Sequence, residues 1–240
     1  MENWEKETER IASWMREQTK EAGAKGLVFG MSGGIDSSVV AVLAQKTFGQ
    51  ETLGILMPCY STPQDLEDAL EVTNRFSIPH RVVPLEKPFD TILEVLDETK
   101  ENRDLPVVNL KPRLRMCILY YFANKLNYLV CGSSNRSEIT VGYFTKYGDG
   151  AVDIAPLAHL TKNEVRSLAK FLGIPERIIT KAPSAGLWPG QTDEGEMGIP
   201  YEQIDRFITR GSAEEPYLSR IQTMHKRNQH KLHPPLTLLP

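Results

Sequence analysis

The stretch that decides the predicted fold is GLVFGMSGGIDSSVVAVLAQKTFG, residues 26–49. Its apolar run at 26–31 is typical of a buried strand, and residues 35–49 are typical of a helix that ends at Gly49. Between them, GMSGGIDSS at 30–38 forms a turn that places backbone N–H groups and the positive end of a helix at the carboxyl edge of a sheet. The sequence therefore predicts an anion site, usually for phosphate, at this turn.

Strands and helices alternate on both sides of this stretch. Further strands are predicted at 51–58, 80–85 and 127–132. Helices are predicted at 3–22, 63–77, 87–101, 112–126, 162–173, 200–210 and 215–231. The segment 182–200 is rich in Gly and Pro and is expected to be a mobile loop. This alternation predicts an α/β fold with a doubly wound, mostly parallel sheet flanked by helices, in one domain spanning 1–240.

Composition excludes several classes of protein. The chain has 240 residues, 40% hydrophobic residues and a net charge of −3, which argues against a general nucleic-acid or membrane-surface binder. The first residues are charged and lack the apolar core of a signal peptide, and no apolar run is long enough to span a bilayer. Cys59, Cys117 and Cys131 lie far apart, so we expect buried, reduced thiols in a cytoplasmic protein.

The residues of the turn favour phosphate chemistry over a plain turn. Gly33 and Gly34 let the backbone approach a ligand, and the serines at 32, 37 and 38 supply hydroxyl donors. The turn matches neither a Walker A motif nor GxGxxG. A phosphate would repel Asp36 unless a cation intervened, and a magnesium-bridged pyrophosphate resolves that conflict. The alternative is an ordinary glycine turn capped by Asp36.

The pattern SGGxDS at 32–37 resembles the signature of the ATP pyrophosphatases, which cleave ATP between the α and β phosphates to adenylate an oxygen. The resemblance implies a Rossmann-like, adenine nucleotide alpha hydrolase-like fold. By itself this motif indicates the type of reaction and leaves the substrate open.

Longer segments narrow the resemblance to the NAD synthetases. They are NLKPRLRM (109–116), GSSNRSE (132–138), VGYFTKYGDGAVDIAPL (141–157), LTKNEV (160–165), APSAGLWPGQTDEGEMGIPYEQID (182–205) and HKR (225–227). The resemblance implies that ATP adenylates the nicotinate carboxylate of deamido-NAD, and that ammonia then displaces AMP to give NAD. It also implies Mg²⁺ as cofactor and a homodimer.

The resemblance assigns roles residue by residue. ATP would be bound by Gly30, Met31, Ser32, Gly33, Gly34, Ile35, Asp36, Ser37, Ser133, Lys162 and Ser184, with Asp36 and Lys162 catalytic. Magnesium would be held by Asp36 and Glu138. Deamido-NAD would be bound by Arg113, Lys146, Asp149, Asp153, His225 and Lys226.

Taken without the resemblance, several of these residues have ordinary alternatives. Glu138 carries a hard oxygen ligand, but a lone Glu is usually solvated. Arg113 suits a phosphate, although a solvated helix face is the simpler explanation. Lys146 and Asp149 lie in a Gly-rich connection that a plain turn also explains. Lys162 sits at a predicted helix start, where a cation is mildly unfavourable, which points to an anionic ligand.

The nitrogen source is expected to be free ammonia. The ATP turn begins at residue 30, which leaves no room before it for the amidase domain of glutamine-dependent relatives. Two other functions stay open: a tRNA-thiolating or sulfur-transferring ATP pyrophosphatase, and a nucleotide-binding sensor without catalysis. The first usually needs a cysteine pair or a basic extension, and the second would not need Asp36, Glu138 and Lys162.

Overall fold

The centre of the protein is a four-stranded parallel sheet with the strand order β3-β2-β1-β4. The computed structural model describes residues 3–188, 190–235 and 237–238. The strands are β1 (Gly26–Gly30), β2 (Thr52–Leu56), β3 (His80–Val82) and β4 (Tyr128–Val130). In register, Val28 of β1 lies opposite Leu53 of β2 and Val130 of β4. The predicted doubly wound, parallel sheet is confirmed.

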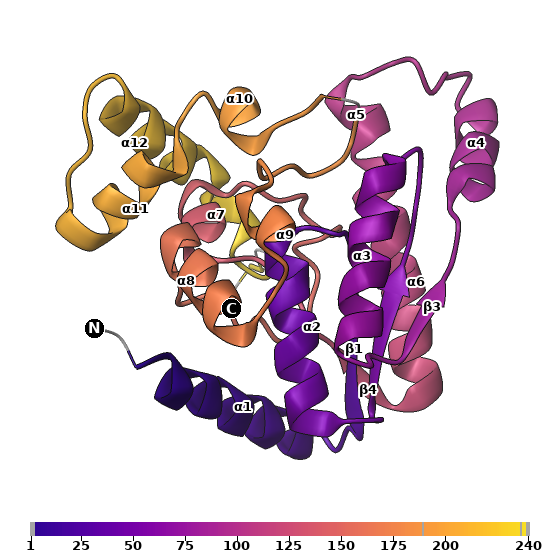
Figure 1. Ribbon diagram of the computed structural model, residues 1–240. Coiled ribbons are helices and arrows are strands. Elements are labelled where there is room, and N and C mark those ends of the chain that lie inside the picture. The colour runs from indigo at the N-terminus through magenta and orange to yellow at the C-terminus, as the bar shows by residue number, and fades with distance from the viewer. Residues whose placement is uncertain (1–2, 189, 236, 239–240) are drawn as a thin grey trace.

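Helices cover both faces of this sheet and extend beyond its β4 side (Figure 1). They are α1 (Trp4–Glu21), α2 (Ile35–Phe48), α3 (Pro63–Arg75), α4 (Glu86–Val95), α5 (Leu105–Val108), α6 (Leu110–Leu126), α7 (Arg136–Val141), α8 (Lys162–Leu172), α9 (Glu176–Thr180), α10 (Asp193–Met197), α11 (Tyr201–Arg210) and α12 (Tyr217–Asn228), followed by the 3₁₀ turn η1 (Gln229–Lys231).

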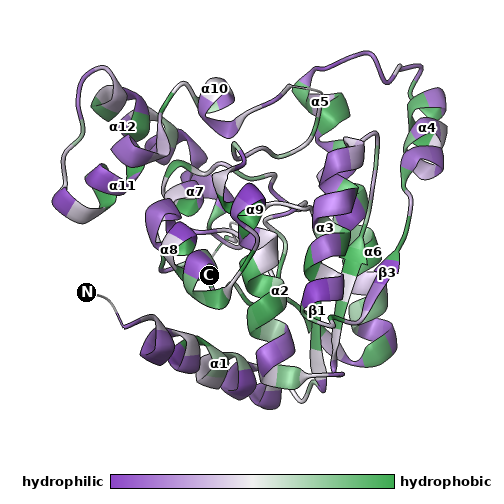
Figure 2. Cartoon of the chain, viewed as in Figure 1, coloured by the Kyte–Doolittle hydropathy of each residue, from purple (hydrophilic) through white to green (hydrophobic). Residues whose placement is uncertain are grey.

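Alternate residues of the strands point into two separate cores, as the two-residue period of a strand requires. On one face, Leu27 and Phe29 pack with residues of α1, α2, α3 and α8. On the other face, Val28 packs with residues of α4 and α6, including Phe89 and Phe122. Helix α2 is buried along most of its length, and Figure 2 shows hydrophobic green on part of it with hydrophilic purple near an end.

A third, smaller core lies away from the sheet and joins α7 to α10, α11 and α12. Its buried members include Val141, Met197, Tyr201 and Ile221. This core ties the C-terminal helices to the segment that follows β4. It therefore brings two parts of the chain, about sixty residues apart in sequence, to the same end of the molecule (Figure 1).

Several local predictions need correction. The helix expected at 87–101 ends at Val95, and Asp97 adopts a left-handed φ of 54° that a helix cannot continue through. Helices α7, α9 and α10 were not predicted, because six or fewer residues carry too little periodicity. Cys117 is exposed, contrary to the expectation of buried thiols; Cys59 and Cys131 are buried and all three cysteines are free.

The Gly- and Pro-rich segment 182–200 has its own internal contacts. The Leu187 N–H donates to Gln191 Oε1 (2.8 Å), and the Asp193 N–H donates to the carbonyl of Pro183 (2.9 Å). Lys111 at the start of α6 donates to the carbonyl of Leu187 (2.7 Å). Among the residues described here, no helix is long and apolar enough to cross a membrane.

Candidate active site

The predicted phosphate turn lies between the carboxyl end of β1 and the start of α2. Gly34 is the N-cap of α2, and no side chain of the described residues bonds to the N–H groups of its first turn. These backbone donors are thus available to an anion. The interpretation of the turn as one capped by Asp36 is wrong, because the Asp36 carboxylate is directed to another partner, Lys162.

Close packing fixes the shape of this turn. Gly33 has a φ of +77°, and a Cβ at this position would lie 2.2 Å from the backbone carbonyl oxygen of Asp65 in α3. Only glycine fits both conditions. Behind it, Ser37 Oγ and Ser38 Oγ both donate to the Gly34 carbonyl, at 3.0 and 2.8 Å.

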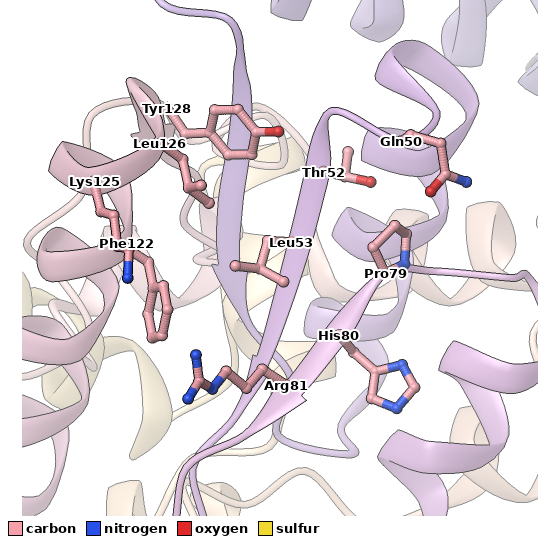
Figure 3. A pocket seen from close by; sticks show the side chains of 10 residues that line it. All are labelled: Gln50, Thr52, Leu53, Pro79, His80, Arg81, Phe122, Lys125, Leu126 and Tyr128. Atoms are coloured by element: carbon pink, nitrogen blue, oxygen red, sulfur yellow. The ribbon is translucent and has the colours of Figure 1, made fainter.

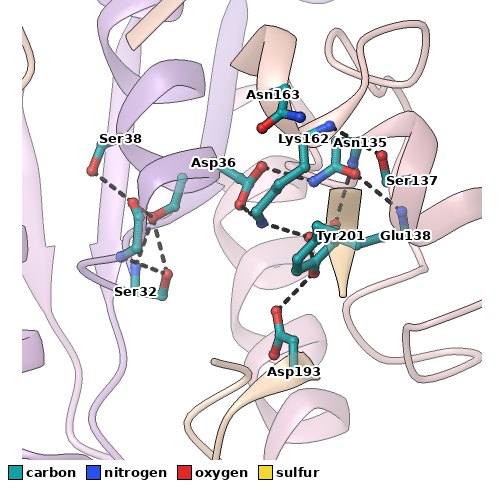
Figure 4. A network of polar contacts seen from close by, with 12 residues as sticks. Ser32, Asp36, Ser38, Asn135, Ser137, Glu138, Lys162, Asn163, Asp193 and Tyr201 are labelled. Carbon is teal, nitrogen blue, oxygen red and sulfur yellow. Dashed lines mark hydrogen bonds and ion pairs between the residues drawn. The ribbon is translucent and has the colours of Figure 1, made fainter. Parts of the chain in front are cut away.

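A buried lysine joins the turn to two other helices, as Figure 4 shows. Lys162 begins α8 and is 1% exposed. Its Nζ donates to Asp36 Oδ2 of α2 (2.6 Å) and to Glu138 Oε1 of α7 (3.0 Å). These three side chains are called the Lys162 cluster below. The position of Lys162 at a helix start predicted an anionic ligand. In the structure, its anionic partners are two carboxylates of the chain itself.

Capping interactions place the two carboxylates. Asn135 is the N-cap of α7: its Oδ1 accepts from the Glu138 N–H (3.0 Å), while its Nδ2 donates to Asp36 Oδ1 (2.9 Å). Thr161 and Glu164 form the capping box of α8 that their spacing predicts. Because both helices begin at the cluster, the caps determine where Glu138 and Lys162 lie relative to Asp36.

The electrostatics of the cluster follow from its burial. Burial raises the pKa of the Glu138 carboxyl to about 7, against the opposing effect of the Lys162 ammonium. Burial by itself would lower the pKa of Lys162, but the charges of Asp36 and Glu138 outweigh it and raise that pKa. Lys162 is thus held as a cation in a site with little water.

Two residues of α11, Tyr201 and Asp205, lie against the Lys162 cluster, and the sequence analysis did not identify them. The fully buried Tyr201 places its hydroxyl 3.2 Å from Glu138 Oε1 and 2.8 Å from Asp193 Oδ2, with its ring centroid 4.7 Å from Lys162 Nζ. Asp205, one turn later, accepts from the backbone N–H of Asn163 (2.9 Å) and from the Ser137 hydroxyl. The signal was their i, i+4 spacing, which puts both on one helix face.

Asp193 of α10 brings the 182–200 segment to the same place. It is buried, and its Oδ1 has no hydrogen-bond partner among the described residues. A buried carboxylate oxygen without a partner is costly, and burial raises the pKa of this group. The segment therefore forms one wall of the cluster.

The residues expected to bind the dinucleotide lie in a second, more exposed group. Arg113 Nη2 donates to the carbonyl of Lys146 (3.5 Å), and Lys146 Nζ donates to the carbonyl of His230 (2.6 Å). Asp149 Oδ1 accepts from the Thr145 N–H (3.0 Å). Asp153 lies apart, where its carboxylate accepts from the Val130 N–H at the end of β4 (2.7 Å).

The remaining expected ligands make few contacts. His225 Nδ1 donates to the carbonyl of Thr140 (2.7 Å), and Lys226 is exposed beside it. Ser133 is half-buried after β4. Ser184 Oγ accepts from the Gly186 N–H (3.1 Å) in the 182–200 segment. No hydrogen bond joins Ser133 or Ser184 to the Lys162 cluster in the part of the chain that is described.

The donors of the cluster fit a hard divalent cation in type. Asp36 and Glu138 present carboxylate oxygens to one shared positive group, here the Lys162 ammonium. Mg²⁺ typically takes one or two carboxylates and completes its shell with waters and phosphate oxygens. Within the described ranges, no group of three or more His, Cys, Asp or Glu side chains forms an all-protein metal site.

An open groove lies elsewhere and does not belong to this site (Figure 3). It is lined by Gln50, Thr52, Leu53, Pro79, His80, Arg81, Phe122, Lys125, Leu126 and Tyr128. Thr52 and Tyr128 are the first residues of β2 and β4, so this groove is at the amino end of the strands. Ligands of open α/β sheets bind at the carboxyl end, where the Lys162 cluster lies.

Known proteins resemble this chain in fold and in sequence. The sequence profile described as NAD synthase matches residues 7–235. A curated relative, the NH(3)-dependent NAD(+) synthetase of Carboxydothermus hydrogenoformans, is 50% identical over 231 residues, which cover 95% of each chain.

Solved structures of NMN and NAD synthetases also resemble this chain. The NMN synthetase of Francisella tularensis superposes with a TM-score of 0.94 at 38% identity, covering 99% of each chain. The NH3-dependent NAD synthetase of Campylobacter jejuni superposes with a TM-score of 0.81 at 30% identity, covering 100% of each chain. With a glycine turn at α2, a buried Lys162 cluster and these likenesses over nearly its whole length, the chain belongs to the NAD synthase family.

Proposed function

We propose that this protein is an ammonia-dependent NAD synthetase, a ligase that converts ATP, deamido-NAD and ammonia into NAD, AMP and diphosphate. The observation that carries the proposal is the Lys162 cluster, which places a buried cation and two carboxylates at a helix N-terminus suited to phosphate. This arrangement serves polyphosphate chemistry, and that chemistry needs no side-chain nucleophile. It therefore suits a reaction in which the substrates themselves supply nucleophile and leaving group.

In the first step, an oxygen of the nicotinate carboxylate attacks the α phosphorus of ATP. The bond between that phosphorus and the bridging oxygen to the β phosphate breaks, and diphosphate leaves. The N–H groups at the start of α2 and the Lys162 ammonium stabilise the charge that develops on the departing oxygens. The product is an acyl adenylate.

In the second step, ammonia attacks the carbonyl carbon of the adenylate. The C–O bond to AMP breaks, the nitrogen loses a proton, and the amide of NAD forms. Water would compete with ammonia for this carbonyl. The 182–200 segment, held over the cluster through Asp193 and Tyr201, would exclude water from it.

The individual assignments divide between the two substrates. We assign ATP to Gly30, Met31, Ser32, Gly33, Gly34, Ile35, Asp36, Ser37, Ser133, Lys162 and Ser184. We assign deamido-NAD to Arg113, Lys146, Asp149, Asp153, His225 and Lys226. The mutual contacts of Arg113, Lys146 and the tail carbonyl of His230 support a common site for Arg113 and Lys146.

We assign Mg²⁺ to Asp36 and Glu138, whose carboxylates already share a cation in this structure. When bound there, the ion would neutralise charge on the ATP phosphates.

We further propose a homodimer in which α6 is covered by a second copy. Residues 114–122 of this helix, LRMCILYYF, contain one charge in nine positions, yet Tyr121 is 57% exposed and Cys117 is exposed. A helix that is apolar on all sides is normally buried. We also infer that residues 1–240 act as one domain, and that the protein works in the cytoplasm, where free thiols such as its three cysteines stay reduced.

The test of the function is NAD formation by the purified protein from ATP and deamido-NAD, with ammonium or with ammonia-free glutamine, above neutral pH. We expect activity with ammonium alone. Glutamine hydrolysis would need a reactive thiolate, and burial raises the pKa of Cys59 to about 11 and also raises that of Cys131. Comparable rates with both donors would contradict the proposed nitrogen source.

A second candidate substrate is nicotinate mononucleotide, which would give nicotinamide mononucleotide by the same two steps. It is favoured by the TM-score of 0.94 to a protein described as an NMN synthetase. A competition assay with equal concentrations of deamido-NAD and nicotinate mononucleotide separates the two. Preferential formation of the dinucleotide amide supports the first proposal, and preferential formation of the mononucleotide amide supports the second.

A further inference from the structure

The C-terminal carbonyls of α7 are bonded by side chains from a distant part of the chain. A helix end leaves its last carbonyls without partners inside the helix. In α7, the Gly142 and Tyr143 N–H groups bond to the carbonyls of Ile139 (3.1 Å) and Glu138 (2.9 Å), as at many helix ends with a left-handed glycine. The next three carbonyls, at 140–142, need other donors.

All three receive donors from α12 and η1, about ninety residues later. His225 Nδ1 donates to the carbonyl of Thr140 (2.7 Å), and Asn228 Nδ2 donates to that of Val141 (2.8 Å). Lys231 Nζ donates to the carbonyls at 142 (2.8 Å) and 144 (2.9 Å). Residues 225–231, called the tail below, therefore follow the carbonyls of 140–144 in order.

Lys231 is committed to this contact. No carboxylate lies within ion-pair distance of its ammonium among the residues described, and the ammonium sits 5.4 Å from the ring centroid of Phe144. Burial lowers the pKa of this lysine. A half-buried cation that faces two carbonyls and a ring is well suited to hold a helix end, where the dipole is negative.

The tail also contacts the segment that carries residues assigned to deamido-NAD. The segment 142–149, called the loop below, carries Lys146 and Asp149, and Lys146 Nζ returns a hydrogen bond to the carbonyl of His230 in the tail (2.6 Å). Gly142 leaves no space between the two: a Cβ there would lie 2.3 Å from Asn228 Cβ. The tail and the loop are thus bonded in both directions.

We propose that Asn228 and Lys231 are positioning residues for the nicotinate substrate, which hold the loop so that Lys146 and Asp149 meet it. The inference rests on the proposed function of the loop. Neither residue needs to touch substrate. Their removal should weaken deamido-NAD and leave ATP unaffected, because the ATP site is built on α2 and α8.

The first experiment compares Lys231→Met and Lys231→Arg with the wild type. We expect Lys231→Met to raise KM for deamido-NAD about tenfold, with kcat and KM for ATP little changed, because charge-assisted hydrogen bonds are lost. Arginine can donate to both carbonyls, so Lys231→Arg should restore most of the affinity. An unchanged KM for deamido-NAD in Lys231→Met, or an equal rise for both substrates, would overturn the proposal.

A matched pair of glycine variants separates positioning from general destabilisation. Gly142→Ala and Gly173→Ala both place alanine at a left-handed helix C-cap, but only the first meets Asn228; nothing lies within 4 Å of the second. Both variants should lower the melting temperature through the left-handed backbone, Gly142→Ala further because of its clash, and KM for deamido-NAD should rise in Gly142→Ala alone. Equal effects of the two variants on KM would contradict the proposed role of the tail.

Amide hydrogen exchange of the ligand-free protein tests the tail without relying on activity. Lys231→Met should speed exchange of amides in 143–150, and Lys231→Arg should not. Unchanged exchange in Lys231→Met would overturn the inference even if the wild type makes NAD. If the wild type makes no NAD from deamido-NAD but exchange responds as expected, the assigned substrate is wrong and the coupling of tail and loop stands.

Discussion

The two halves of the candidate site are built in opposite ways. The Lys162 cluster is buried, and its charged groups bind one another: a lysine that is 1% exposed between two carboxylates. The group around Lys146 is half-buried or exposed, and its charged side chains bond to backbone carbonyls at Lys146 and His230. Buried polar groups need hydrogen-bond partners within the protein, whereas exposed ones are hydrated and stay available to a ligand.

The two halves also differ in which contacts hold their side chains in position. The cluster is preorganised, because capping residues and α11 hold its members before any ligand binds. The exposed half depends on a loop that the tail helps to hold in place, together with contacts from Asn109 and Arg113. We therefore expect substitutions in the cluster to change stability and chemistry together, and substitutions in the exposed half to change substrate affinity.

The largest effect is expected for Lys162→Met. It leaves two mostly buried carboxylates facing each other without a cation, which should cost about 3–5 kcal/mol of the free energy of unfolding. Diphosphate release should fall about 100- to 1,000-fold, since a group that stabilises the departing oxygens is lost. Chemical denaturation and a diphosphate assay measure the two effects.

Lys181 provides the matched control for stability. It also bridges two carboxylates, those of Asp65 and Asp68 at 2.7 Å each, but keeps 30% of its side chain exposed. Solvent screens such a pair, so Lys181→Met should destabilise the protein clearly less than Lys162→Met. Equal losses would mean that burial does not distinguish the cluster.

Asp36→Asn and Glu138→Gln should each reduce adenylation by about 100-fold, because each removes charge from the assigned magnesium site. Glutamine can still serve the capping box of α7, so Glu138→Gln should remain folded. Glu164→Gln, at the equivalent capping position of α8, is the matched control and should retain activity. Near-normal turnover of Glu138→Gln at saturating magnesium would refute the metal assignment.

A smaller effect is expected for Tyr201→Phe. The ring stays beside Lys162, but Asp193 and Glu138 lose the hydroxyl that joins them. The cost should be about 1–3 kcal/mol of stability, as for other buried carboxylates that lose a donor. We expect kcat to fall with KM for deamido-NAD unchanged; the reverse split in steady-state kinetics would show that Tyr201 does not act through the Lys162 cluster.

The smallest effect should come from Arg113→Ala in the exposed half. The loss of a charge-assisted contact should weaken deamido-NAD about tenfold and leave ATP binding near the wild-type value. The free energy of unfolding should hardly change, because Arg113 is exposed and its one hydrogen bond among the described residues is long (3.5 Å). Isothermal titration with each substrate checks this, and equal weakening of the two would show that Arg113 is misplaced.

Much of the fold was predictable because its signals are local. The run at 26–49 identified β1, the turn and α2 to within one residue, since a short apolar run, a glycine turn and a helix that ends at a glycine are each recognised from neighbouring residues. The capping box of α8 was predictable from Thr161 and Glu164 for the same reason. Short helices such as α7 and α10 were missed, although they carry Glu138 and Asp193.

The sequence by itself determined the parallel sheet, the glycine turn before α2 and the family, because these depend on residues near one another in the chain. Only the tertiary structure decided which charges meet. Lys162 and Asp36 are separated by 126 positions, and Lys231 and Gly142 by 89. Nothing local marks such pairs, since a lysine at a helix start and one in a tail look alike in sequence. Their roles follow from burial, which leaves a charge or a helix end no water to bind and requires a partner from elsewhere in the fold.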